Sequence, residues 1–104
     1  MNNNKRTERV LEISELERGT KKLTIKLVEL DIQNSSLFLE EGLKIIHNGE
    51  RKLIIDMAYV NFVDSEGVWA VSELVQKAKE NEAKIVLENV TENVKRVFDM
   101  TKIS

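Results

Sequence analysis

The sequence predicts a single α/β domain, with three helices and a mixed sheet of about four strands. Short apolar runs typical of strands alternate along the chain with longer segments whose apolar residues recur at helical spacing. Strands that alternate with helices are usually parallel neighbours joined by right-handed crossovers. A length of 104 residues matches one domain with a modest core.

The chain begins with two predicted strands. Residues 10–13 form a short apolar stretch, and apolar and polar residues alternate over residues 23–30, as in a half-buried strand. The charged connection between them contains Gly19, which suits a turn, so we expect the two strands to pair antiparallel. Residues 1–9 are polar and lack periodicity, which predicts a flexible N-terminal tail ahead of a domain over residues 10–104.

Three helices follow, each with a recognisable start. Asn34 and the two serines after it predict a first helix, which ends near His47. A second helix is expected over about residues 65–81, where an Asp-Ser pair precedes the first apolar positions. Thr91 is expected to cap a third helix, whose apolar residues recur at i, i+3 and i+4.

Two later strands, residues 53–55 and 85–87, are continuous apolar runs, which favours burial on both faces of the sheet. The apolar positions of all these elements predict the core. Its members are Leu23, Ile25, Leu27, Leu39, Leu43, Ile46, Leu53, Ile55, Val71, Val75, Ile85, Leu87, Val94, Val97 and Phe98.

Composition excludes several classes of site. The absence of cysteine excludes disulfides and thiolate sites, and a single histidine, His47, excludes a multi-histidine metal centre. A net charge of -2, with both signs mixed along the chain, argues against a nucleic-acid surface. No apolar run suits a membrane span or a secretory signal, so a cytoplasmic location is expected. No cofactor site and no nucleophile-base pair is visible, so we expect a binding protein and not an enzyme.

The candidate site lies where strands end. In open α/β sheets, functional groups gather at the carboxyl ends of the strands, and Asp31, residues 64–67 and residues 88–89 occupy such positions. Ser65 stands at the start of the second helix, where backbone N–H groups lack intrahelical partners and could hold a phosphate. Asp and Ser are also the commonest helix N-caps, so the pattern alone leaves a purely structural role open.

A helical projection of residues 65–81 separates two faces. Apolar residues cluster on one side, and Trp69 falls nearly opposite their centre. An exposed Trp one turn from a helix-terminal serine suits a partner-binding surface, although it could instead fold over its own helix. The residues predicted to share this side are Ser65, Trp69, Ser72, Glu73 and Gln76.

These segments together resemble a known family. Residues 53–57 and 60–67, Leu-Ile-Ile-Asp-Met and Val-Asn-Phe-Val-Asp-Ser-Glu-Gly, resemble the central signature of STAS domains. Glu29-Leu30-Asp31 is similar to the Gly-Glu-Leu-Asp segment of that family, and residues 83–98 resemble its last strand and helix. The resemblance covers roughly residues 10–104.

The resemblance is strongest to anti-sigma factor antagonists. Such proteins bind an anti-sigma factor that is also a serine kinase, and this binding frees a sigma factor. Phosphorylation of the serine in the signature turn ends the binding, and a serine phosphatase reverses the modification. The resemblance implies that Ser65 is the phosphorylated residue, and that Asp31, Asp64, Glu66 and Gly67 form its surroundings.

Two positions depart from the family pattern. Val28 stands where the family often has Gly, and Glu66 replaces a frequent second Ser. STAS domains also occur in transporters, lipid-transfer complexes and stress-signalling assemblies. The alternative function is therefore an accessory or scaffold subunit that binds its partners without serine phosphorylation.

Overall fold

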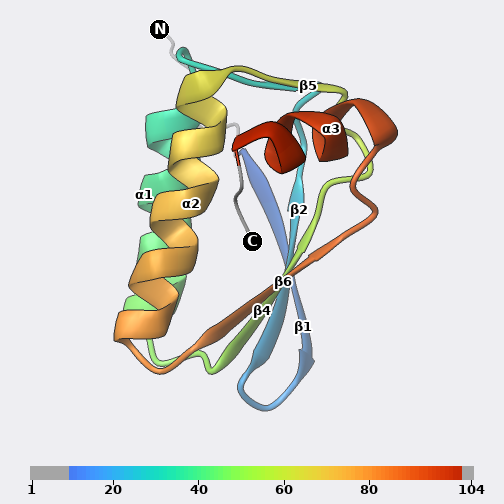
Figure 1. Ribbon diagram of the computed structural model, residues 1–104. Coiled ribbons are helices and arrows are strands. Elements are labelled where there is room, and N and C mark those ends of the chain that lie inside the picture. The colour runs from blue at the N-terminus through green and yellow to red at the C-terminus, as the bar shows by residue number, and fades with distance from the viewer. Residues whose placement is uncertain (1–9, 102–104) are drawn as a thin grey trace, which may run out of the picture.

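Four strands form the central sheet, in the order β1-β2-β4-β6 (Figure 1). The computed structural model describes residues 10–101. Its strands are β1 (Leu11–Glu17), β2 (Thr20–Ile25), β4 (Lys52–Asp56) and β6 (Lys84–Glu88). The first two pair antiparallel, whereas β2, β4 and β6 run parallel, so the sheet is mixed as predicted.

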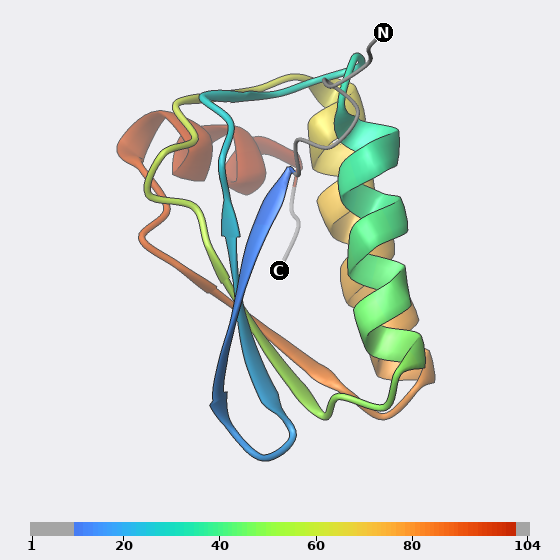
Figure 2. The same ribbon diagram turned by 180° about the vertical axis from the view of Figure 1, so that it is seen from behind.

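The turn between β1 and β2 is tied to the next strand of the sheet. Gly19 has a φ of +80°, a left-handed conformation that favours glycine. Its carbonyl accepts hydrogen bonds from the backbone N–H groups of Arg51 and Lys52, both at 2.9 Å. Figure 2, seen from behind, shows this turn at the end of the molecule opposite β3 and β5. The predicted hairpin is confirmed.

A second, two-stranded ribbon lies beyond the main sheet. It pairs β3 (Glu29–Leu30) in parallel with β5 (Phe62–Val63). The single strand predicted over residues 23–30 is wrong, because β2 ends at Ile25 and the chain then leaves the sheet to join β5. Alternation along the sequence could not reveal that the second half of this stretch changes its pairing partner.

Three helices complete the domain: α1 (Ser35–His47), α2 (Ser65–Glu80) and α3 (Glu92–Thr101). α1 and α2 lie side by side along one face of the sheet (Figure 1). They approach closely where a Cβ on Gly42 would come within 2.7 Å of the Leu74 side chain. α3 runs across the direction of α2 and contacts α2 and β5 (Figure 1), and its Phe98 borders a groove with Val75 of α2 and Ile85 of β6.

Neither apolar strand is buried on both faces, which corrects the prediction: β4 is buried on one face, and the apolar residues of β6 are all half-buried. Leu53 and Ile55 are fully buried, whereas Ile54 between them is half-buried. Ile54 is in register with Lys22 of β2 and Val86 of β6, which are also half-buried. Because α1 and α2 cover only one face, the other remains partly open to solvent.

The predicted core is confirmed, because all fifteen residues are buried in the core or packed against it. On α1, however, the most buried residues are Phe38, Gly42, Ile45 and Ile46, while Leu39 and Leu43 are half-buried. Other core members that the sequence had not singled out are Leu11, Leu30, Met57, Val60 and Val63.

Two further sequence predictions concern the N-terminal tail and membrane-spanning helices. The predicted N-terminal tail, residues 1–9, lies outside the described residues. Among residues 10–101, no helix combines the length and the apolar character that a membrane crossing requires.

Candidate functional site

The start of α2 is fixed by the side chain of Asp64. Asp64 has extended backbone angles, and its Oδ1 accepts a hydrogen bond from the Gly67 N–H at 2.9 Å. A carboxylate in this position satisfies one of the free N–H groups of the first turn and lies at the positive end of the helix dipole. The N-cap of α2 is therefore Asp64 and not Ser65.

The second oxygen of the same carboxylate joins α2 to the β3–α1 loop. Asp64 Oδ2 accepts from the Ile32 N–H at 3.0 Å, and the Asp64 N–H donates to the Leu30 carbonyl at 3.3 Å. Asp31, which precedes Ile32, is thereby brought to the same end of the molecule as Ser65. The resemblance had suggested this proximity, and the described hydrogen bonds supply its physical cause.

The β3–α1 loop is itself held by side-chain hydrogen bonds. Asn34 Oδ1 accepts from the Asp31 N–H at 2.9 Å, and Asn34 Nδ2 donates to the Glu29 carbonyl at 3.0 Å. Asp31 Oδ1 in turn accepts from the Gln33 N–H at 3.0 Å. Asn34 is the N-cap residue of α1, at the helix start predicted from the sequence, but its side chain closes this loop and makes no hydrogen bond to the helix.

Gly67 allows the first turn of α2 to pass close to β3. A Cβ at this position would lie 2.2 Å from the Leu30 carbonyl oxygen, which is far inside van der Waals contact. The obstacle is backbone, so a side-chain rotation could not relieve it. Glycine at position 67 is thus required by the same contact that positions Ser65.

Ser65 is the first residue of α2, and it is exposed. Its hydroxyl makes no hydrogen bond with any other residue in the described part of the chain. Because Asp64 already supplies the cap, the Ser65 hydroxyl is not needed to hold the start of α2. This geometry leaves the hydroxyl accessible at a helix N-terminus, beside backbone donors suited to an anion.

The carboxylates around Ser65 have no cationic partners within residues 10–101. Five salt bridges are present in this part of the chain, and all lie elsewhere on the molecule. Glu66 is exposed, and Asp31 and Asp64 are half-buried and bonded to backbone N–H groups. Negative charge is therefore concentrated at this end. The acidic residues that contribute to it are Glu29, Asp31, Asp64 and Glu66.

The sequence matches the model of a protein family described as STAS domain, over residues 27–104. This match covers three quarters of the chain. The chain belongs to the STAS domain family.

Solved structures agree with this STAS assignment. The unphosphorylated form of the anti-sigma factor antagonist SpoIIAA superposes with a TM-score of 0.76 at 20% identity, over 89% of this chain and 81% of that one. A putative anti-sigma factor antagonist from Thermotoga maritima gives 0.79 at 18% identity, over 88% and 78% of the two chains. At these identities the likeness establishes the fold.

A membrane protein also contains a similar region. The murine anion transporter Slc26a9 gives a TM-score of 0.67 at 27% identity. The match covers 79% of this STAS chain but only 14% of the transporter.

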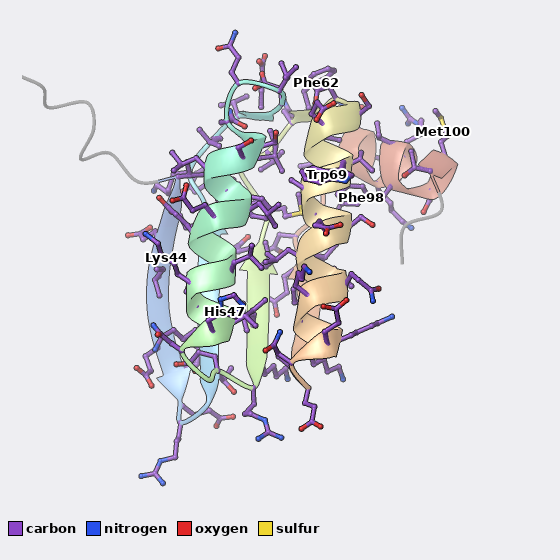
Figure 3. The ribbon with its side chains drawn as sticks, turned by 90° about the vertical axis from the view of Figure 1, so that its left-hand side faces the viewer. Lys44, His47, Phe62, Trp69, Phe98 and Met100 are labelled. Atoms are coloured by element: carbon purple, nitrogen blue, oxygen red, sulfur yellow. The ribbon has the colours of Figure 1, made fainter. Side chains whose placement is uncertain are left out.

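The exposed face predicted for α2 of the STAS domain is confirmed. Trp69 is 49% exposed, and Ser72 and Gln76 are also exposed, while Glu73 is half-buried. Figure 3 shows Trp69 on α2 below Phe62, which lies at the N-terminal end of the helix. Ser65 and Trp69 thus open onto solvent from the same helix.

Several apolar residues on and beside the β3–β5 ribbon are exposed, which the sequence had not predicted. Tyr59 lies before β5 and Phe62 lies in it, and Val28 and Ile32 flank β3. Each is more than half exposed. One signal was available: a short strand that buries Val63 must point Phe62 the other way, because successive side chains alternate across a strand.

A separate polar cluster lies at the ends of β4 and β6. Asp56 Oδ1 accepts from Asn89 Nδ2 and from the Ala58 N–H, both at 3.0 Å, and Lys22 Nζ lies 3.5 Å from Oδ2. The Asn89 amide, followed by the Ala58 N–H and Lys22, holds the pKa of Asp56 below its ordinary value. Of residues 88–89, which the sequence analysis grouped with the candidate site, Asn89 therefore binds Asp56 and not the Ser65 end. No metal-binding group of three or more His, Asp or Glu occurs within residues 10–101.

Proposed function

We propose that this STAS domain is an anti-sigma factor antagonist whose Ser65 is a phosphorylation switch. In the unmodified form it binds an anti-sigma factor that is also a serine kinase, and this binding frees a sigma factor. Phosphorylation of Ser65 ends the binding, and a serine phosphatase restores it. The protein acts by binding and catalyses no reaction.

The observation that carries this proposal is that Asp64, and not Ser65, caps α2. A serine that capped α2 would have its hydroxyl engaged by the helix. Here Asp64 is the cap, and the exposed Ser65 hydroxyl has no partner among the described residues. A kinase could therefore modify Ser65 without breaking a hydrogen bond that holds the fold.

The physics of the modification supports an effect on the partner and not on the fold. A phosphate adds about -1.5 to -2 charge at neutral pH. Free N–H groups and the dipole of α2 stabilise such a group by about 0.3 to 1 kcal/mol per charge at an exposed position. In a closed interface shaped for a hydroxyl, however, desolvating an unpaired charge costs several kcal/mol.

Two variants of Ser65 test the switch against the purified anti-sigma factor kinase. Ser65→Ala should bind as tightly as wild type and resist phosphorylation, and Ser65→Asp should fold normally but bind at least tenfold more weakly. Calorimetry measures both affinities, and mass spectrometry of the kinase reaction identifies the modified residue. Tight binding by Ser65→Asp, or labelling of the Ser65→Ala variant at a different residue, would contradict the proposal.

A second candidate function is a STAS subunit that binds without phosphorylation, as part of a transport, lipid-transfer or stress-signalling assembly. The observation in its favour is the 27% identity to a region of an anion transporter. Glu66, in place of the frequent second Ser, also adds charge that disfavours a neighbouring phosphate. Under this alternative, a partner would bind wild type and Ser65→Ala equally, and no kinase would label the protein.

A further inference from the structure

Four apolar side chains form an exposed patch on the ribbon side of Ser65. The ribbon patch consists of Val28, Ile32, Tyr59 and Phe62, which are 62%, 68%, 55% and 51% exposed. Scattered single apolar residues are normal on a protein surface, but exposed apolar residues gathered on two paired segments, 28–32 and 59–62, mark an interaction site. Trp69 lies on α2, one turn after Ser65.

The patch is fixed in place by the backbone of the ribbon. The Val28 carbonyl accepts hydrogen bonds from the Asn61 N–H at 2.7 Å and the Phe62 N–H at 3.3 Å. Pairing of β3 with β5 directs Leu30 and Val63 into the core and leaves Phe62 outside. Little ordering entropy would be lost when a partner contacts side chains held on such a frame.

Each remaining member of the ribbon patch is also anchored. The backbone of Ile32 is held by the hydrogen bond from its N–H to Asp64 Oδ2. The Tyr59 ring carries Lys26 Nζ at 4.8 Å from its centroid, a cation–π distance. Aromatic and aliphatic residues presented in this way are the usual anchors of protein interfaces.

The charges around the ribbon patch define the partner that it suits. Glu29 and Glu66 are exposed near it, and neither has a cationic partner within residues 10–101. The one cation against the patch in the described chain, Lys26 over Tyr59, is itself paired with Glu12 at 3.5 Å, so the unpaired charge is acidic. A lipid surface with anionic headgroups would be repelled by these carboxylates. A second copy placed face to face would bring the same acidic groups together, which is equally unfavourable. A protein surface with apolar pockets and flanking Lys or Arg residues is complementary.

We propose that the ribbon patch is a docking surface for the kinase of the proposed switch, separate from Trp69 and the Ser65 hydroxyl. The inference rests on the proposed function for the identity of the partner. The kinase contributes an apolar pocket bordered by basic residues. It contacts Ser65 from two sides, through the ribbon patch and through the exposed face of α2.

Phosphorylation kinetics with the purified kinase and ATP test this proposal. Phe62→Ala and Ile32→Ala should each raise the KM for this protein at least tenfold and leave kcat within a factor of two, because the anchors act in docking and not in phosphoryl transfer. Met100→Ala is the matched control, since Met100 is 73% exposed and lies on α3, apart from Phe62 (Figure 3). Circular dichroism and urea unfolding of each variant verify the fold.

The outcomes separate this inference from the proposed function. Phosphorylation of wild type at Ser65, with an unchanged KM for both Phe62→Ala and Ile32→Ala, would overturn the docking surface and leave the switch intact. Loss of kinase binding in these variants, with no labelling of wild type, would support the surface while refuting the switch. A dimer in analytical ultracentrifugation that Phe62→Ala abolishes would overturn the inference, since the patch would then bind a second copy.

Discussion

The acidic residues of the sheet and those around Ser65 are held in different ways. On the sheet, Asp56 accepts from the Ala58 N–H but also faces a cation, Lys22 Nζ of the neighbouring strand, at 3.5 Å. Glu50, just before β4, likewise lies 3.0 Å from Lys21 Nζ of β2. Around Ser65, Asp64 and Asp31 accept hydrogen bonds from backbone N–H groups and have no cationic partner in the described chain. The first arrangement neutralises charge, whereas the second fixes the position of a carboxylate and leaves its charge available to a partner.

This difference indicates where the molecule is built for stability and where it is built for recognition. The sheet ion pairs link neighbouring elements of the fold and are partly screened by solvent. The Ser65 end presents fixed negative charge beside exposed apolar side chains, a combination that favours a basic protein partner. The variants below test the two regions separately, beginning with the largest expected effect.

Gly67→Ala should cause the greatest loss of stability. The added Cβ would lie 2.2 Å from the Leu30 carbonyl oxygen, so α2 and β3 must separate. We expect a loss of about 3 kcal/mol or more in the free energy of unfolding, at the upper end of overpacking effects. Urea unfolding monitored by circular dichroism measures it.

Gly42→Ala is the matched control for this substitution. Its Cβ would meet the Leu74 side chain, at 2.7 and 2.8 Å from the two Cδ atoms, and a side chain can shift more readily than the backbone carbonyl that faces Gly67. The loss should therefore be clearly smaller than at position 67, although both glycines are buried in helices. Equal losses for the two variants would show that the contact between α2 and β3 does not constrain the Ser65 turn.

Trp69→Ala should separate recognition from folding. Trp69 is 49% exposed and lies opposite the buried face of α2, so the free energy of unfolding should change by less than about 0.5 kcal/mol. Affinity for the proposed kinase partner should fall by about 2 kcal/mol, the scale of an interface hot spot. Calorimetry and urea unfolding on the same preparations measure both quantities. A large loss of stability would mean that Trp69 supports the fold.

The sequence predicted the helices well because their signals are local. Periodic apolar residues and the Asp-Ser pair placed α2 within one residue of its observed end, and Trp69 was correctly assigned to the exposed face. The core was predicted for the same reason. These features depend on neighbours three or four residues away, which a sequence shows directly.

The errors concern pairing and layers, which only the tertiary structure decides. The strand predicted over residues 23–30 divides between two sheets, because Glu29–Leu30 pairs with a segment more than thirty residues away. The prediction that both faces of the strand with Ile54 are buried was wrong, because α1 and α2 cover only one face of the sheet. At the site, Ser65 was located from sequence, but the apolar ribbon patch was missed because the outward direction of Phe62 depends on that same pairing.

Asp64→Ala should lower the free energy of unfolding by less than Gly67→Ala does. The substitution removes the acceptor of both the Gly67 and Ile32 N–H groups. Loss of an N-cap usually costs about 0.5 to 2 kcal/mol, and we expect the upper part of this range because two elements lose their link. Asp64→Asn, which keeps one acceptor oxygen, should lose less. Urea unfolding of both variants is the measurement, and an effect of Asp64→Ala no larger than that of Asp64→Asn would contradict the two-way link.

Asp56→Asn should give the smallest effect, and one that depends on pH. The amide can still accept from the Asn89 side chain and the Ala58 N–H, but it loses the charge that faces Lys22. We expect the free energy of unfolding to fall by about 1 kcal/mol at pH 7, since the pair is partly exposed and screened.

The pH dependence of this effect follows from the pKa of Asp56. The folded-state pKa of Asp56 lies below its ordinary value of 3.8, so its charged form stabilises the fold above that value. This contribution falls away as the pH drops through the lowered folded-state pKa. The difference between wild type and Asp56→Asn in urea unfolding should therefore shrink in acid and vanish once the carboxyl is protonated in both states. A difference that stays constant from neutral pH into strong acid would show that the charge of Asp56 contributes nothing to the ion-paired sheet.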